Sequence, residues 1–412
     1  METAVPLRWR ETTSAERRTL IAAGLGWMLD AYDVMLYSLV LAALVREFGI
    51  SKSAAGLLNT LTLLASAAGS IAIGILADRY GRRRMLSASI LIYSFATFAC
   101  GLSQTILELA IFRFLLGLGM GGEWNSGAAL VAETWPAKWR GRALGIVQSS
   151  WAVGYALAAV TAGVLLARSG WRWVFFVGVF PALVVLWIQR GVPEPEVWKR
   201  QAQARSQEPR DDRPGLWRRH GRNLAVLLLM NTFGMFAWWG LFTWIPAYLE
   251  LPIAQGGRGF PLAGTTWFLL VLNLAGMLPG YLLFGVLADR YGRKRSLVVY
   301  LVAAALLVPW LAMARRPGMI LVAACLVAFF GTGFFTGSGI VGSELFPTSI
   351  RATALGASYN VARGLSAFAP FLIGAIGQAH GLAGAFLLCG LAFALAALSA
   401  AFLPETRGTV IA

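Results

Sequence analysis

Charged residues are scarce in this chain. Asp, Glu, Lys and Arg together make up 13% of its 412 residues, whereas hydrophobic residues make up 58%. Soluble domains carry about 25% charged residues and roughly 45–50% apolar ones, so the composition excludes an ordinary soluble protein. A membrane helix needs roughly 20 apolar residues, and the hydrophobic content suffices for about a dozen such helices. The composition therefore predicts a polytopic helical membrane protein.

Cysteine and histidine are also rare. Cys100, Cys325 and Cys389 all lie within apolar runs and show no paired spacing, which excludes a disulfide scaffold. The two histidines, His220 and His380, lie between predicted spans, so we expect neither a histidine metal site nor an intramembrane imidazole relay. No nucleophile–base constellation is evident, so we expect no enzymatic activity, no catalytic or metal site and no cofactor.

Apolar stretches bounded by charged residues or by Gly and Pro predict twelve membrane spans. The first six begin near Leu20, Ala54, Met85, Ile106, Ala143 and Trp173. The second six begin near Leu224, Ala263, Ser296, Met319, Thr353 and Ala383. The arginine-bearing segment before the first span is not followed by a short apolar stretch with a small-residue cleavage site, so we interpret the first span as a retained helix rather than a signal peptide.

The basic residues predict the orientation. An even number of spans places both termini on the same side of the membrane. If the amino terminus is cytoplasmic, 26 of the 35 Lys and Arg residues lie inside, 7 lie outside and two, Arg113 and Arg363, lie within spans. This imbalance follows the positive-inside rule. The net charge of +16 lies in short clusters between apolar runs, which is not the pattern of a nucleic-acid-binding face. We therefore expect a monomer in the cytoplasmic (inner) membrane, with both termini cytoplasmic and with lipid, not nucleic acid, around it.

The two halves of the chain repeat each other at an offset of 211 residues. The sequence GILADRYGRRR that begins at Gly74 matches GVLADRYGRKR that begins at Gly285, and the same offset relates the loop at Glu133 to the loop at Glu344. Parallel six-helix repeats place a substrate site at their interface, near the bilayer midplane, where the halves can rock around it. The repeat therefore predicts a transporter.

These doubled loops, Gly-x-x-x-Asp-Arg-x-Gly-Arg-[Arg/Lys] and Glu…Arg, resemble those of the major facilitator superfamily over essentially the whole chain. The resemblance implies an all-α membrane protein of twelve transmembrane helices in two parallel six-helix repeats. We expect these bundles at residues 1–190 and 223–412, with a cytoplasmic linker at 191–222. Within the family, GLGMGGEW from Gly117 resembles bacterial sialate and monocarboxylate proton symporters, and DAYD from Asp30 is similar to the first-helix motif of aromatic-acid symporters and nicotinate carriers.

Charged side chains at membrane depth are the candidate functional groups. Each costs on the order of 2.5–3.5 kcal/mol there, so each implies a partner or a water-filled cavity. Asp30 and Asp33 share one face of the first span with Tyr37, because Asp33 follows Asp30 by three residues and Tyr37 follows Asp33 by four. The charged residues at this depth are Asp30, Asp33, Arg113, Glu123 and Arg363.

A first-helix Asp33 that faces Arg113 of the fourth span is similar to the proton-coupling pair of sugar symporters in this superfamily. Separation of the two would let the carboxyl take up a proton, and re-pairing would expel it. The alternative is a static buried ion pair that fixes two helices. Glu123 is either a second proton site or an acid that serves helix packing.

Arg363 forms one polar stripe with Tyr359 and Asn360 on the eleventh span. Its planar guanidinium suits a carboxylate bidentately, and the second half offers no acid to neutralise it apart from Glu344 at a cytoplasmic end. An anionic substrate is the partner we expect, and the alternative is a pairing with one of the first-half carboxyls. Aromatic and amide side chains that could complete the substrate site are Tyr37, Gln148, Trp151, Tyr155, Asn231, Trp238 and Asn273.

Short cytoplasmic loops combine acids, arginines and glycines. In the family such loops latch neighbouring helix ends when the cavity faces outward. Arginines that only set topology would explain the basic excess, but not the paired acids or the glycines. The expected cytoplasmic gate comprises Asp78, Arg79, Gly81, Arg82, Glu133, Arg140, Asp289, Arg290, Gly292, Arg293, Glu344 and Arg351, with Glu133–Arg140 and Glu344–Arg351 as a second set of latches.

The leading hypothesis is a secondary active transporter that takes up a small organic anion, a monocarboxylate, together with protons by alternating access. Arg363 would grip the carboxylate while Asp33, Glu123 or Asp30 binds the proton. An aromatic-acid or nicotinate-type carrier and a sugar-type carrier are alternatives, and Arg363 argues against a neutral sugar. A non-transporting sensor is a further alternative, but such sensors usually append a signalling domain, which we do not expect here.

Overall fold

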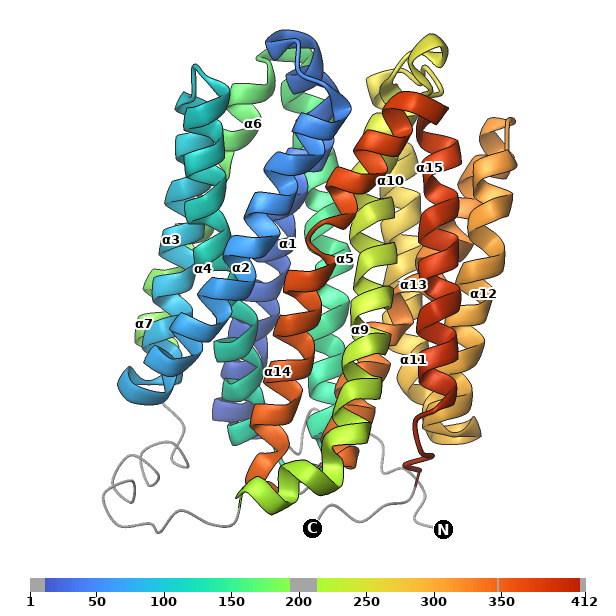
Figure 1. The fold of residues 1–412 in the computed structure, drawn as a ribbon. Coiled ribbons are helices and arrows are strands. Elements are labelled where there is room, and N and C mark those ends of the chain that lie inside the picture. Colours follow the sequence, from blue (N-terminus) through green and yellow to red (C-terminus); the bar gives the residue numbers. More distant parts are fainter. Residues whose placement is uncertain (1–11, 193–212, 347, 408–412) are drawn as a thin grey trace.

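The computed structural model describes residues 12–192, 213–346 and 348–407, and these residues form helices joined by short connections (Figure 1). The elements of the first half are α1 (Ser14–Phe48), α2 (Lys52–Tyr80), α3 (Arg82–Leu102), α4 (Ile106–Thr134), α5 (Ala137–Arg168), α6 (Trp171–Val177) and α7 (Pro181–Gly191). Those of the second half are α9 (Arg213–Glu250), the 3-10 turn η2 (Ile253–Gln255), α10 (Leu262–Val271), the π-helical turn η3 (Leu272–Met277), α11 (Leu278–Tyr291), α12 (Arg293–Met313), α13 (Pro317–Leu345), α14 (Thr348–Ser366) and α15 (Ala369–Ala401). The described residues contain no strand, so the expected all-α fold is confirmed.

The elements make twelve passes, as the sequence predicts. Ten stretches of the described residues are long and apolar enough to cross a membrane, and one of them, Ala354–Ala401, is 48 residues long. A straight helix of that length would measure about 72 Å, more than twice the hydrocarbon core of about 30 Å. It makes two passes because Gly381, with φ 78° and ψ 153°, interrupts the helix. α4 supplies the remaining pass, while α6 with α7 forms the sixth and α10 with η3 and α11 forms the eighth.

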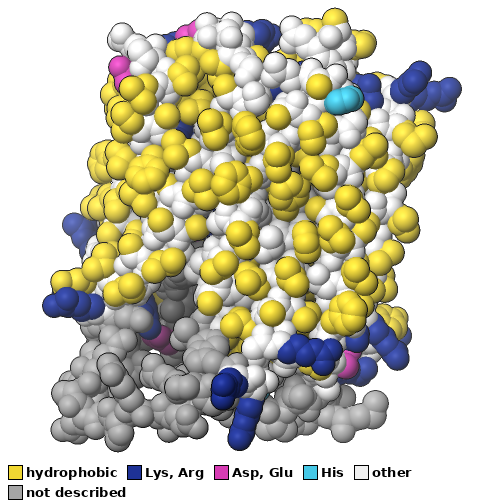
Figure 2. Space-filling view, viewed as in Figure 1, with side chains coloured by type: hydrophobic (Ala, Val, Ile, Leu, Met, Phe, Trp, Pro, Cys, Tyr) yellow, Lys and Arg dark blue, Asp and Glu magenta, His cyan; other side chains and the backbone are white. Residues whose placement is uncertain are grey.

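The face of the bundle seen in Figure 2 carries an apolar belt. Large side chains such as Ile75, Leu107 and Leu306 are between 64% and 72% exposed, which suits contact with lipid tails rather than with water. In this view, basic side chains gather mainly at the end of the belt where α1 begins and α15 ends. We call this the terminal end of the bundle, and the other the opposite end.

Local signals set several helix ends. The Glu16 amide donates to the Thr13 hydroxyl at 3.2 Å and the Thr13 amide donates to the Glu16 carboxylate at 2.8 Å, a capping box that starts α1. The turns between α2 and α3 and between α11 and α12 need backbone with φ of 112° at Gly81 and 105° at Gly292. Only glycine adopts such values without strain, and these two glycines occupy equivalent places in the repeat.

Glycines also let the two halves approach closely. A side chain at Gly56 of α2 would collide with the Pro370 carbonyl of α15, and one at Gly163 of α5 would collide with Thr266 of α10. The halves meet where α2 lies against α14 and α15, where α5 lies against α10 and α11, and where α1 lies against α9. This interface brings α1, α5, α9 and α14 to the centre of the molecule (Figure 1).

The helix after the linker starts earlier than expected. α7 ends at Gly191, and α9 already begins at Arg213, within the segment 191–222 that the sequence assigns to the linker. Apolar length alone places the helix start near Leu224, whereas the helix continues into the basic residues before it. Residues 193–212 lie outside the described part of the chain.

Candidate functional site

Three carboxyl groups lie together in the first half, and we call Asp30, Asp33 and Glu123 the carboxyl cluster. Each of them is only 1% exposed. Asp30 and Asp33 come from α1, and Glu123 comes from α4, where its carboxylate lies against Gly26 of α1. Asp30 interacts electrostatically with both of the other carboxyls. The structure therefore brings together the three acids that the sequence selects.

Asp33 lies deeper among the helices of the first half. Its Oδ1 and the Thr97 methyl group both lie beside Gly178, at the break between α6 and α7. The Thr97 hydroxyl donates to the Tyr93 carbonyl at 2.8 Å, and no described residue makes a hydrogen bond of good geometry to either oxygen of Asp33. A buried carboxyl with so few partners is more stable when it carries a proton.

The ion pair expected between Asp33 and Arg113 is not formed. Instead, Arg113 donates to the Asn59 side-chain oxygen at 2.8 Å, and its guanidinium carbon lies 4.1 Å from the centre of the Tyr37 ring. Tyr37 follows Asp33 by four residues, so Arg113 meets α1 about 6 Å further along the helix axis. The Tyr37 hydroxyl is fixed by a 2.6 Å bond to the Ala55 carbonyl. The spacing on α1 identifies the correct face, but not the depth at which α4 crosses it.

Asn59 is a functional candidate that the sequence analysis missed. Its amide nitrogen donates to the Thr243 hydroxyl of α9 at 3.0 Å while its oxygen accepts from Arg113. All three side chains are at most 1% exposed. A buried hydrogen-bonded chain thus runs from α4 through α2 to the second half. The sequence feature that could have identified Asn59 is the presence of an amide side chain within the apolar run of the second span.

Arg363 of α14 lies at the interface of the halves, where its neighbour Gly364 contacts Ala67 of α2. Its side chain is only 2% exposed, so it does not face lipid. No carboxylate of the described residues lies within ion-pair distance of it, and its Nε has no hydrogen-bond partner among them. It nevertheless interacts electrostatically with Asp30 and Glu123. Arg363 therefore lies near Asp30 and Glu123 without an ion pair to either.

Tryptophan rings continue the site across the interface. The Trp151 ring of α5 lies 4.8 Å from that of Trp27, 5.8 Å from that of Trp238 and 6.0 Å from that of Trp239. Trp238 also meets Phe335 of α13 at 5.7 Å. These five rings, from α1, α5, α9 and α13, form what we call the aromatic array. Trp27 and Trp239 were missed, although the 211-residue offset relates Trp27 to Trp238.

The other predicted pocket residues are buried or half-buried around these groups. Gln148 accepts a 3.0 Å bond from the Trp27 indole, and the Tyr155 hydroxyl donates to the Phe242 carbonyl of α9 at 3.3 Å. Neither side-chain polar atom of Asn231 has a hydrogen-bond partner among the described residues, and the same holds for the Asn273 side-chain oxygen in η3. A π-helical turn of this kind often marks a functional site. Among the stripe of α14, Tyr359 is half-buried and Asn360 is 8% exposed.

The predicted gate residues form one matching ion pair in each half, at the terminal end. Arg82 pairs with Glu133 at 3.1 Å, and Arg293 pairs with Glu344 at 3.3 Å. Arg293 also pairs with Asp289 at 2.8 Å. In each half, the acid of the second cytoplasmic loop, Glu133 or Glu344, thus pairs with an arginine of the first cytoplasmic loop. The sequence analysis did not assign these partners.

The structure describes the side chains of only some of the remaining gate residues. Arg79 and Arg290 each lie over the tyrosine that follows them, at 5.5 and 5.3 Å from the ring centre. The side chains of Asp78, Arg140 and Arg351 lie outside the described part of the structure, so the predicted pairs Glu133–Arg140 and Glu344–Arg351 stay predictions.

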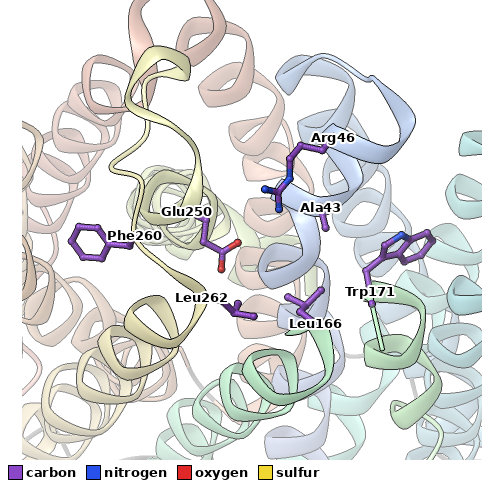
Figure 3. A pocket seen from close by; sticks show the side chains of 8 residues that line it. Ala43, Arg46, Leu166, Trp171, Glu250, Phe260 and Leu262 are labelled. Carbon is purple, nitrogen blue, oxygen red and sulfur yellow. The ribbon is translucent and has the colours of Figure 1, made fainter. Parts of the chain in front are cut away.

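A pocket of about 280 Å³ opens between the halves at the opposite end (Figure 3). Arg46 of α1 and Glu250 of α9 face each other across it, with Trp171 of α6 beside them. Arg46 and Glu250 interact electrostatically but are not within ion-pair distance. The pocket therefore lies between the first and seventh passes, on the side away from the gate residues.

Comparison with known proteins identifies the family. The Major Facilitator Superfamily model matches residues 23–265 and 251–410. The chain is 35% identical over 406 residues to a probable 4-methylmuconolactone transporter of Cupriavidus pinatubonensis, covering 96% of this chain and 92% of that protein. It is 32% identical over 395 residues to the cis,cis-muconate transport protein of Acinetobacter baylyi, covering 93% and 94%. The partially occluded, inward open structure of the xylose transporter XylE from E. coli matches its fold with a TM-score of 0.78 at 20% identity, covering 97% of this chain and all of that one. The chain therefore belongs to the Major Facilitator Superfamily, a family of multi-pass membrane transporters and not of enzymes.

Proposed function

We propose that this transporter takes up a small organic anion, a monocarboxylate, together with protons. The observation that carries the proposal is Arg363, which is buried at the interface of the halves without an ion-pair partner among the described residues. A guanidinium without an ion-pair partner at membrane depth is costly, and a substrate carboxylate would supply that partner through two charge-assisted hydrogen bonds. The names of the relatives, which include carriers of 4-methylmuconolactone and cis,cis-muconate, favour the broader class of small organic acids.

Proton coupling follows from the electrostatics between Arg363 and the carboxyl cluster. Arg363 interacts electrostatically with Asp30 and Glu123, and a nearby positive charge in general favours the ionised form of a carboxyl. An anion bound to Arg363 would cancel that charge and so favour protonation of a nearby carboxyl. This coupling is reciprocal, so a bound proton would also favour the anion. Substrate and proton would therefore load together.

Asp33 is the second proton site in this proposal. With Arg113 held by Asn59 and Tyr37, Asp33 has no basic partner in the described structure. Movement of Arg113 by about one helix turn along α1 would bring it to Asp33 and would expel the proton. Because Asn59 is bonded to Thr243 of α9, this movement would depend on how the second half is placed.

The transport cycle uses the ends of the bundle in turn. The excess of basic residues favours a cytoplasmic position for the terminal end, so the Arg46–Glu250 pocket would face outward in the cytoplasmic membrane. The ion pairs of Arg82 and Arg293 would close or release the cytoplasmic side. The bundles 1–190 and 223–412 of one monomer would rock around the central site.

The aromatic array favours a substrate with a planar apolar part. Trp151, Trp238 and Trp239 together present three rings within about 6 Å of one another at the interface. Tryptophan faces and edges pack well against conjugated or aromatic groups. An aromatic or unsaturated monocarboxylate therefore fits the combined site better than lactate or a neutral sugar does.

Uptake into proteoliposomes tests the proposal. Radiolabelled benzoate, lactate and gluconate would be compared, each with and without an inward proton gradient, and xylose would serve as the neutral control. We expect a proton gradient to drive accumulation of benzoate above its external concentration and above the passive accumulation in protein-free liposomes, with less or none of the others. Accumulation of xylose, or anion uptake that ignores the proton gradient, would contradict the proposal.

A further inference from the structure

An open groove of about 680 Å³ lies at the terminal end of the second half. Its wall is apolar and consists of Val298 and Val299 of α12 and Ala401 of α15. Its rim carries three basic side chains, those of Lys294, Arg295 and Arg407. The volume falls within the range of about 300–1,000 Å³ that is typical of small-molecule sites. The groove combines an apolar surface with positive charge and is separate from the central site.

The positive charge of this groove is not neutralised by its own residues. Glu405 is the carboxylate among the residues that line it, and one of its oxygens accepts hydrogen bonds from the backbone amides of Arg293 at 2.8 Å and Arg407 at 3.0 Å. The side chains of Lys294, Arg295 and Arg407 form no ion pair with a carboxylate of the described residues. Three cations therefore face the groove against a single anion that is already bonded.

At the equivalent position of the first half, the basic side chain is hydrogen-bonded within the protein. There Arg83, the counterpart of Lys294, donates to two carbonyls at the end of α7, one of them that of Gln189. The Gln189 amide in turn donates to the Ser87 hydroxyl at 2.6 Å. In the second half the 211-residue offset replaces Ser87 by Val298, and no described residue bonds to the Lys294 side chain. One half thus closes this site with its own polar groups, whereas the other leaves it open and apolar.

The depth of the groove matches that of a lipid headgroup. α12 begins at Arg293 at the terminal end, and Val298 lies five residues further on, about 8 Å along the helix. The valine wall therefore reaches into the apolar belt, while the basic rim stays at its edge. Tyr291 at the mouth is 53% exposed, as is common for aromatic residues at the membrane–water interface.

We propose that this groove binds an anionic phospholipid. The lipid phosphate contacts Lys294, Arg295 and Arg407, and one acyl chain lies along the valine wall. Basic pockets between transmembrane helices recognise anionic headgroups in this way. A bound lipid would also fill the apolar groove that the first half closes with its own side chains. The proposal does not depend on which substrate is transported.

Native mass spectrometry of the purified full-length protein tests the proposal. The protein would be titrated with phosphatidylglycerol, with phosphatidylcholine of the same acyl chains, and with inorganic phosphate. We expect one phosphatidylglycerol to bind at least about tenfold more tightly than phosphatidylcholine and to raise the melting temperature, and inorganic phosphate to have neither effect. Equal binding of the two lipids would contradict the charge recognition. Competition by inorganic phosphate at similar concentration would show that the ligand is a soluble anion and not a lipid.

Two variants separate the groove from general surface charge. R295Q/R407Q should weaken phosphatidylglycerol binding by about fivefold for each charge removed, about 25-fold in total. The control R84Q/R190Q removes two exposed arginines from the terminal end of the first half, and it should bind as the wild type does. An equal loss in both double variants would overturn the proposal.

The second kind of variant keeps every charge and fills the groove instead. Val299 is 59% exposed on the wall, so V299W should be accommodated and should occupy the space of the acyl chain. We expect this variant also to lose phosphatidylglycerol binding by about tenfold or more. If V299W bound the lipid as tightly as the wild type, the lipid would lie elsewhere.

Discussion

Replacement of Arg363 by Gln is the sharpest test of the central site. The side chain is 2% exposed, so solvent screens its interaction with a bound carboxylate only weakly. A bidentate contact would contribute two charge-assisted hydrogen bonds of about 1.5–3 kcal/mol each. Glutamine can restore one neutral hydrogen bond of about 0.5–1.5 kcal/mol. We therefore expect R363Q to lose at least about 1.5 kcal/mol of binding free energy, or about 12-fold in affinity.

The substitution R363K adds a graded comparison. Lysine keeps the positive charge but not the planar fork, so its affinity should fall between those of the wild type and R363Q. Binding would be measured by isothermal titration calorimetry with benzoate on the purified protein, and transport by counterflow in proteoliposomes. Melting temperatures would establish that each variant is folded.

The control is R168Q, which makes the same change at an exposed arginine at the C-terminal end of α5. It should bind and transport as the wild type does. If folded R363Q bound benzoate within threefold of the wild type, the assignment of Arg363 to the carboxylate would be wrong. If R363Q and R168Q lost affinity equally, the effect would be one of overall charge.

Three further changes test the surroundings of the site. Asp33→Asn should abolish proton-driven accumulation but spare counterflow exchange, and a variant that still accumulates substrate against its gradient would place the coupling proton elsewhere. Asn59→Ala removes a buried hydrogen bond to charged Arg113 and a neutral one to Thr243. We therefore expect a loss of about 2–4 kcal/mol in the free energy of unfolding, measured by chemical denaturation. A loss below about 1 kcal/mol would show that these two hydrogen bonds contribute little to stability. Glu133→Gln breaks the ion pair with Arg82 and should reduce the uptake rate several-fold at normal membrane insertion, whereas unchanged uptake would argue against a gate.

The fold could be predicted from the sequence because it rests on properties that are local to the chain. The lengths of the apolar runs set the number of passes, and the match between Gly81 and Gly292 revealed the repeat and the two turns that only glycine makes easily. The capping residues before α1 and α4 likewise act within a single turn. The start of α9 at Arg213 was missed because hydropathy does not report a helix that continues into polar residues.

The partners of the charged groups could not be predicted from the sequence. The sequence selected Asp33, Arg113 and Glu123 as buried and polar, since charge at membrane depth is costly wherever it points. It could not show that Arg113 bonds to Asn59 and lies over Tyr37 rather than beside Asp33.

The same division holds for the rest of the molecule. The sequence by itself determined the twelve passes, their repeat and the set of charges that the membrane must tolerate. Only the tertiary structure decided that Arg82 pairs with Glu133, that Trp27 packs against Trp151, and that Arg363 lies near Asp30. The reason is that hydrophobicity and turn chemistry act over a few neighbouring residues, whereas the rotation and depth of each helix are set by packing against helices far away in the chain.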